Sequence, residues 1–173
     1  MSVPSGELAQ GQSGRVAAPG RFLGFDYGEK RVGLALSDPS GSIASPLETY
    51  QRRRPGDDAE HFRRVIDQHN IVRLVVGLPV HTSGREGTKA REARRFGGWL
   101  ANVTGLPVVF WDERFTTVEA ERYLQQAELT AKKRKARRDM LAAQILLQSY
   151  LDAGAPASDQ AARSAAALDD PAN

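Results

Sequence analysis

The stretch from Phe22 to Asp38 constrains the fold of this chain more than any other segment. An apolar run ends on Asp26, a glycine-bearing turn follows, and a second apolar run begins at Arg31. Short runs rich in β-branched and aromatic residues, joined by such a turn, predict two antiparallel strands. A carboxylate at the end of a buried strand is costly unless a cation faces it. The rest of the sequence must therefore supply a counter-charge for Asp26.

The remaining periodicity predicts an α/β domain. Strands are expected over residues 21–26, 31–37, 43–50, 71–76 and 108–111, and helices over 57–69, 89–104, 116–126 and 135–153. Asp57 and Asp58 are expected to cap the first helix and to place negative charge in its first turn. Three strands with tight turns, followed by β-α units with apolar strands, predict a mixed five-stranded sheet in the order β-β-β-α-β-α-β-α. Helices should flank this sheet on both faces.

Composition limits the ordered part of the chain to one domain. The 173 residues, 40% of them hydrophobic, suffice for a single core. Residues 1–20 and 154–173 are rich in small and polar residues without periodicity and are predicted to be disordered extensions around a domain at 21–153. No apolar run approaches the roughly 20 residues of a membrane span, and no signal-peptide core is visible. We therefore expect a soluble, cytoplasmic protein with no membrane partner.

Charge and cysteine content indicate the class of ligand. The chain has no cysteine and three histidines that fit no zinc spacing, so a metal would be held by oxygen ligands, which favour a hard cation. The formal net charge is +3 although the last 22 residues are acidic, so the basic excess lies in the middle of the chain. A basic domain suggests a polyanionic partner, although many solvated surfaces are equally basic.

Acidic residues follow the first and the last predicted strands. Asp26 ends the first, Asp112 and Glu113 follow the last, and Asp139 lies in the first turns of the final helix. Functional groups gather at the carboxyl ends of parallel strands, so these acids are expected to converge. Two Mg²⁺ or Mn²⁺ ions about 4 Å apart would neutralise them and would suit attack of water on a phosphodiester. Only one of Asp112 and Glu113 can point into such a site, because successive strand residues face opposite ways.

Several of these residues also have simpler interpretations. Asp26 can bond the backbone amides of its own turn, and Asp139 can offset a helix macrodipole by roughly 0.3–1 kcal/mol. Tyr27, Trp99 and Trp111 can stack on unpaired bases or belong to the core. The loop at residues 83–88 can hold a phosphate on its amides or be a plain connection.

Four motifs occur in order between about residues 22 and 151. They are Phe-Asp-Tyr-Gly-x-Lys-Arg-Val-Gly-Leu-Ala at 25–35, Val-Gly-Leu-Pro at 76–79 with Gly-x-x-Gly at 84–87, Asp-Glu-Arg-Phe-Thr-Thr-Val-Glu-Ala at 112–120, and Arg-Arg-Asp-Met-Leu-Ala-Ala-Gln-Ile-Leu-Leu-Gln at 137–148. Together they resemble the YqgF (RuvX-like) family of bacterial RNase H-like nucleases. That family is related to RuvC-type Holliday junction resolvases and is also described as pre-16S rRNA nucleases.

The resemblance implies an RNase H-like fold and a nuclease activity that depends on Mg²⁺ or Mn²⁺. It places the catalytic metal ligands on Asp26, Glu113 and Asp139, with Asp112 as the reserve for Glu113. The implied substrates are an rRNA precursor or single-stranded or branched DNA, cut by a monomer or a homodimer. Nine basic residues are expected to contact nucleic acid: Lys30, Arg31, Arg85, Arg114, Lys132, Lys133, Arg134, Lys135 and Arg138.

Two other functions compete with the nuclease. Actin-like and sugar-kinase ATPases also begin with an Asp-x-Gly hairpin, but they need a second domain of similar fold to close over the nucleotide. A non-catalytic RNA-binding module would keep the basic surface and use the acids structurally.

The basic block at residues 132–138, expected in or beside a loop, leads to a first prediction. Neutralising Lys132, Lys133, Arg134 and Lys135 should weaken nucleic-acid binding and flatten its salt dependence, because each lost phosphate contact removes about 0.7–0.9 from the slope of log K against log salt. Binding isotherms at several salt concentrations measure this slope. An unaltered slope would mean that the block is a solvated face without phosphate contacts.

Overall fold

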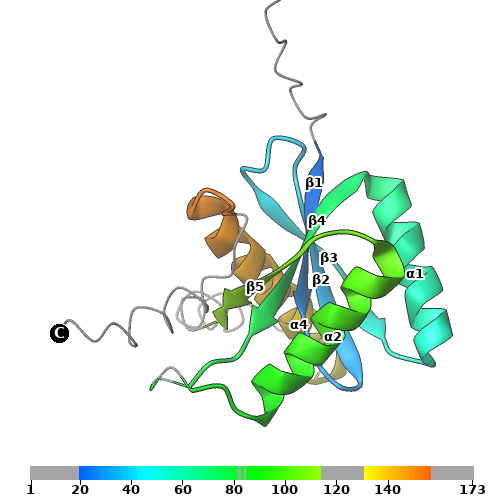
Figure 1. Cartoon of the computed structure of the whole chain (residues 1–173), viewed down its shortest axis with the longest axis vertical. Helices are drawn as coiled ribbons and strands as arrows, with labels where there is room; N and C mark the ends of the chain where they lie inside the picture. Colours follow the sequence, from blue (N-terminus) through cyan, green and yellow to red (C-terminus); the bar gives the residue numbers. More distant parts are fainter. Residues whose placement is uncertain (1–19, 82, 84, 114–130, 157–173) are drawn as a thin grey trace, which may run out of the picture.

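The computed structural model describes residues 20–81, 83, 85–113 and 131–156, apart from the side chains of residues 131–136. Within these ranges, strands and helices follow the predicted order (Figure 1). They are β1 (Arg21–Asp26), β2 (Arg31–Ser37), β3 (Ala44–Gln51), α1 (Pro55–His69), β4 (Ile71–Leu78), α2 (Thr88–Thr104), β5 (Val108–Asp112) and α4 (Ala131–Asp152). The predicted helix over 116–126 and nearly all of both predicted extensions lie outside the described residues. None of the described helices has the length and apolar content of a membrane span.

The strands form one mixed sheet with the order β3-β2-β1-β4-β5. β2 pairs antiparallel with both β1 and β3, whereas β1 and β4, and β4 and β5, are parallel. The predicted mixed five-stranded sheet is therefore confirmed. Because β1, β4 and β5 run in the same direction, Asp26 at the end of β1 and Asp112 at the end of β5 lie at the same edge of the sheet.

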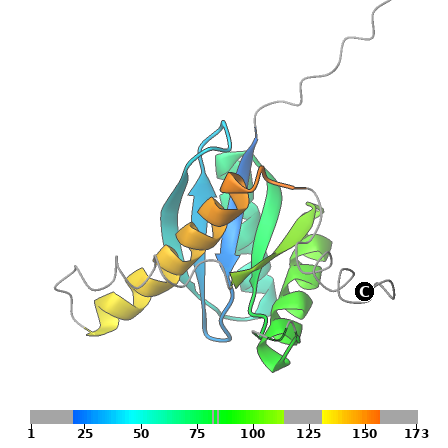
Figure 2. The ribbon, with the colours of Figure 1, turned by 90° about the vertical axis from the view of Figure 1, so that its left-hand side faces the viewer.

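Helices cover both faces of the sheet, as predicted. α1 and α2 lie on one face and α4 crosses the other (Figures 1 and 2). One core cluster joins β1 to α1 and α2 and includes Leu23, Phe25, Phe62, Phe96 and Leu100. A second cluster joins the opposite strand positions to α4 and includes Val75, Trp111, Leu146, Leu147 and Tyr150. The alternation of side chains along each strand thus divides the core into two layers.

Glycines allow α4 to lie directly against the strands. A Cβ atom on Gly33 of β2 would overlap the carbonyl oxygen of Asp139, and one on Gly24 of β1 would come within 2.9 Å of the Leu147 Cβ. Real Cβ contacts are longer, so a side chain at either position would force the helix away from the sheet. The close approach brings the backbone of Asp139 onto the sheet beside β1.

The first helix begins earlier than predicted. α1 starts at Pro55 after Arg54, so the expected capping role of Asp57 and Asp58 was wrong, although both lie in the first turn. Proline suits this position because it fixes φ and has no N–H that needs a partner. Asp58 is instead fully buried and accepts hydrogen bonds from Tyr50 Oη at 3.0 Å and from the Arg53 amide at 2.8 Å.

The last helix also begins earlier than predicted. α4 starts at Ala131, so residues 132–138 belong to a helix, and the alternative that placed the basic block within a loop was wrong. Lysine, arginine and alanine all favour helix, which explains why the helix extends through this block. Asp139 consequently lies more than two turns after the helix start, beyond the reach of the macrodipole at the N-terminus.

The close packing of α4 predicts opposite effects for two alanine substitutions. Gly33→Ala should lower the free energy of unfolding by about 1–3 kcal/mol, because the new methyl group would overlap the backbone of α4. Gly98→Ala is the matched control, since a Cβ there meets no atom within 4 Å and alanine favours the interior of α2. It should raise stability by about 0.5–1 kcal/mol. Urea unfolding measures both values, and a Gly33→Ala variant as stable as the wild type would contradict the packing argument.

Candidate active site

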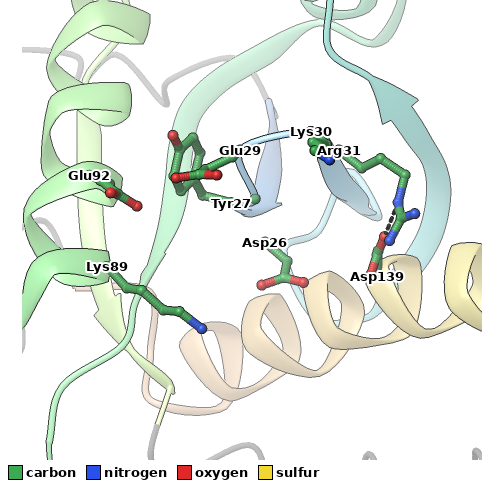
Figure 3. A pocket seen from close by; sticks show the side chains of 9 residues that line it. Asp26, Tyr27, Glu29, Lys30, Arg31, Lys89, Glu92 and Asp139 are labelled. Atoms are coloured by element: carbon green, nitrogen blue, oxygen red, sulfur yellow. Dashed lines mark hydrogen bonds and ion pairs between the residues drawn. The ribbon is translucent and has the colours of Figure 1, made fainter.

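Asp26 ends β1 on the face of the sheet that α4 covers. Residues two apart in a strand share a face, and Gly24 lies against Leu147 of α4. Figure 3 shows the Asp26 carboxylate directed toward α4. The side chain is therefore held between the sheet edge and the helix.

The acids after β5 lie on opposite faces. Trp111 packs in the cluster with α4, so Asp112 points to the other face, where it is 1% exposed, and Glu113 returns to the α4 face. A Cβ atom on Gly77 of β4 would overlap Glu113 Oε1 and lie 3.1 Å from Leu146 Cδ2 of α4. Glu113 thus occupies space that the missing side chain of Gly77 leaves open. The structure places Glu113, rather than Asp112, on the face that Asp26 occupies.

Asp139 extends from α4 and is held by an arginine. Arg31 Nε donates a hydrogen bond to Asp139 Oδ2 at 2.8 Å, and about one fifth of the Asp139 side chain is exposed. Arg31 opens β2, directly after the turn that follows Asp26. The ion pair joins two residues 108 positions apart and holds the Asp139 carboxylate at the side of the site (Figure 3).

Burial and neighbouring carboxylates raise the pKa of two of the acids, Asp26 and Glu113. Burial, followed by the negative charges of Glu113 and Asp139, raises the pKa of Asp26 to about 7. Burial and the charge of Asp112 raise the pKa of Glu113 to about 7, with Lys89 acting in the opposite direction. Like charges in a largely buried site disfavour ionisation. A cation bound among these groups would restore their charged forms.

The donor atoms suit a hard cation, but the three acids do not converge on one point. All three offer carboxylate oxygens, the ligands that Mg²⁺ and Mn²⁺ prefer. Among the described residues, however, no three acidic or histidine side chains are close enough to hold one ion together. Asp26 and Glu113 lie on the same face of the sheet, whereas Asp139 is paired with Arg31 and would have to leave this arginine to bind an ion.

A pocket of about 420 Å³ opens beside Asp26. It is lined by Asp26, Tyr27, Gly28, Glu29, Lys30, Arg31, Lys89, Glu92 and Asp139. The sequence-based prediction missed Lys89 and Glu92 of α2, and in Figure 3 Lys89 extends toward Asp26. One signal was available, because a lysine in the first turn of a helix with no acid there opposes the macrodipole.

The predicted phosphate-binding residues divide into three groups. Lys30 and Arg31 line the pocket. Arg85 and Arg138 are exposed but do not line it, and Arg85 lies in a turn closed by a hydrogen bond from the His81 amide to its carbonyl at 3.0 Å. Arg114 lies outside the described residues, as do the side chains of Lys132, Lys133, Arg134 and Lys135.

Comparisons with known proteins identify relatives of the whole domain. The family model RuvX, described as Holliday junction resolvase, matches residues 20–153. A "Putative pre-16S rRNA nuclease" of Rhodopirellula baltica is 46% identical over 136 residues, which are 79% of each chain. A protein of the same name from Koribacter versatilis is 44% identical over 136 residues, covering 79% of this chain and 89% of the relative.

One solved structure supports the fold assignment. The fowlpox virus resolvase, in a complex with substrate Holliday junction DNA, aligns with a TM-score of 0.51 and 12% identity. The alignment covers 79% of this chain and 99% of that chain. At this identity the similarity concerns the fold alone, and it agrees with the predicted RNase H-like architecture.

The raised pKa of Asp26 predicts a stabilising substitution. Without divalent ions, the wild type should lose stability as pH rises from about 4 to about 7, because the unfolded state releases this proton at lower pH than the folded state. Asp26→Asn removes the charge, so above pH 7 it should be more stable than the wild type by about 2–4 kcal/mol. The difference should shrink toward pH 4. Urea unfolding in EDTA at several pH values measures it.

Asp67→Asn on the exposed face of α1 is the control and should change stability little at any pH. If Asp26→Asn is no more stable than the wild type above pH 7, burial and repulsion do not raise the pKa of Asp26 as described above.

Proposed function

This chain belongs to the RuvX family of Holliday junction resolvases, and we propose that it is a divalent-metal-dependent nuclease that hydrolyses phosphodiester bonds in nucleic acid. The observation that supports the proposal is that Asp26 and Glu113 face α4 at the sheet edge, with Asp139 of α4 near Asp26, and that the pKa of the first two is raised to about 7. Shifts of this kind are typical of functional sites, because an isolated fold gains nothing from crowding carboxylates.

Asp26 and Glu113 would hold Mg²⁺ or Mn²⁺, and Asp139 would join them after leaving Arg31. When bound, such an ion lowers the pKa of a water molecule and stabilises negative charge on the phosphate. Lys89 limits the repulsion around Glu113. We assign the catalytic set to these three acids.

Basic residues around the pocket would bind the phosphate backbone. Lys30, Arg31 and Lys89 line the pocket and present ammonium or guanidinium groups to an anion. An incoming phosphate would compete with Asp139 for Arg31, so substrate binding would also free Asp139 for the metal ion. Arg85, Arg114, Arg138 and the block at residues 132–135 would extend this contact along the strand.

The most specific substrate we propose is the 16S rRNA precursor, after the names of the relatives, with cleavage at its 5′ end as our own further proposal. A protein with this substrate would act in the cytoplasm. Branched DNA is the second candidate, because the matching family is described as Holliday junction resolvase. Two symmetric nicks in a junction need two active sites, so that activity would favour a homodimer over a monomer.

The nuclease proposal predicts a metal-dependent cut that the acid variants lose. Purified protein is incubated with a precursor 16S 5′ fragment, a four-way DNA junction or single-stranded DNA in Mg²⁺, Mn²⁺ or EDTA. The wild type should cleave at least one substrate with a metal and none in EDTA. Asp26→Asn, Glu113→Gln and Asp139→Asn should each lower the rate by more than the roughly 10- to 100-fold typical of residues around a metal site, while binding persists.

Asp112→Asn tests the neighbouring acid on the opposite face, whose charge raises the pKa of Glu113 although it does not face Asp26. With its folding verified by thermal melting, it should retain cleavage. Cleavage that continues in EDTA would refute the metal-dependent mechanism. Binding by the wild type without cleavage in either metal would point to the non-catalytic RNA-binding module. ATP hydrolysis without nucleic-acid cleavage would favour the kinase-like alternative.

A further inference from the structure

A second pocket adjoins the acidic one. It encloses about 290 Å³ and is lined by Tyr27, Arg52, Pro55, Glu92, Arg95, Phe96 and Trp99. Tyr27 and Glu92 line both pockets, so a ligand in one is next to the other. The volume lies at the lower limit of small-molecule pockets, roughly 300–1,000 Å³, and suits a single ring system. We refer to this second pocket as the aromatic pocket.

One face of α2 connects the two pockets. Lys89, Glu92, Phe96 and Trp99 recur at spacings of three and four residues, which places them on one side of the helix. Lys89 lines the acidic pocket, Glu92 lines both, and Phe96 and Trp99 line the aromatic pocket. A bound strand that follows this face would pass from the acids to the aromatic rings.

Three tilted aromatic rings form one wall of the aromatic pocket. The ring centroid of Phe96 lies 4.8 Å from that of Tyr27 and 5.8 Å from that of Trp99, with interplanar angles of 34° and 30°. Phe96 is buried, whereas Tyr27 and Trp99 are half-buried and border the pocket. Trp111, by contrast, is buried against α4 and belongs to the core. Of the three aromatic residues considered for base stacking, Tyr27 and Trp99 therefore remain candidates.

A buried carboxylate fixes a guanidinium group at this wall. Arg52 Cζ lies 5.5 Å from the ring centroids of both Tyr27 and Phe96, and Arg52 Nη1 donates to Tyr27 Oη at 3.3 Å. Arg52 Nε also pairs with Asp58 Oδ2 at 3.3 Å, and Asp58 is itself buried and bonded to Tyr50. Arginine held in this way offers a planar cation that can stack on a base or meet a phosphate.

We propose that the aromatic pocket binds one unpaired nucleobase of the strand whose phosphate lies in the acidic pocket, an inference that rests on the proposed nuclease function. Aromatic rings stack on any base, and the cations Arg52 and Arg95 complement the adjacent phosphates. Selection for an unpaired base would direct cleavage to single-stranded or distorted segments and away from regular duplex. An apolar peptide side chain would gain little from these two arginines.

A binding experiment without cleavage tests the proposal. Hexaadenylate RNA and an abasic ribose-phosphate hexamer of equal charge are titrated in EDTA, and Trp fluorescence and anisotropy are followed. The wild type should bind the RNA about 5- to 150-fold more tightly than the abasic chain, and only the RNA should quench Trp99. Trp99→Ala should bring this ratio close to one and leave the affinity for the abasic chain unchanged. Trp99→Phe keeps a stacking ring, so it should preserve most of the ratio, and it isolates the signal of Trp111.

Arg52→Ala and Arg53→Ala form a matched pair, because each removes one positive charge from adjacent positions. Arg52 borders the aromatic pocket, whereas Arg53 lines a different pocket with Tyr50 and His61. Arg52→Ala should lower the base-dependent ratio, and Arg53→Ala should leave it unchanged. Thermal melting verifies that each variant is folded, and the comparison of the two oligomers with the wild type needs no variant.

Equal affinities of the wild type for the two oligomers, with no quenching of Trp99, would overturn the proposal. Tighter binding of free ATP than of the RNA, with the same quenching, would also overturn it, because the pocket would then serve a nucleotide ligand. Since cleavage is not measured, base binding can fail while the nuclease proposal stands, and the reverse also holds.

Discussion

The close contact between α4 and the sheet is the constraint on which the candidate site depends. Gly24 and Gly33 have no side chains, so the helix backbone rests directly on β1 and β2. Gly77 leaves a comparable space on β4, which the Glu113 carboxylate occupies. A side chain at these positions would move the helix or the acid outward. Asp139 would then lie farther from Asp26.

The close packing of α4 on the sheet brings the acids near one another and changes their electrostatics. Asp26 and Glu113 are largely buried near other negative charges, which raises their pKa and disfavours the folded state at neutral pH. Arg31 offsets part of this charge through Asp139, and Lys89 offsets part of it near Glu113. A bound metal ion would neutralise the acids further, and a bound phosphate would pair with these two cations. The fold therefore tolerates a cluster of acids that a ligand would stabilise.

α2 extends the site beyond the acids. Its side chains line the acidic pocket and the aromatic pocket in succession, with Glu92 between them. Arg52, fixed by the buried Asp58, completes the aromatic wall from the other side. The same helix face thus offers a cation near the acids and rings farther along. Nucleic acid offers the complementary groups, because each of its phosphates is followed by a flat aromatic base.

Periodicity in the sequence was sufficient for the element order, for the exact bounds of β1 and β2, and for the candidate acids at the strand ends, because these depend on neighbouring residues. The start of α1 was misplaced because Pro55 begins the helix before the expected caps, and the start of α4 was misplaced because the lysines and arginines of the basic block favour helix. Periodicity left Glu113 and Asp112 open, and the family resemblance favoured Glu113. Only the tertiary structure showed that Glu113 lies on the face of Asp26, paired Arg31 with Asp139, and brought Lys89, Glu92 and Trp99 to the site. The physical reason is that these relations join residues far apart in the chain, whose distances are set by sheet pairing and helix packing.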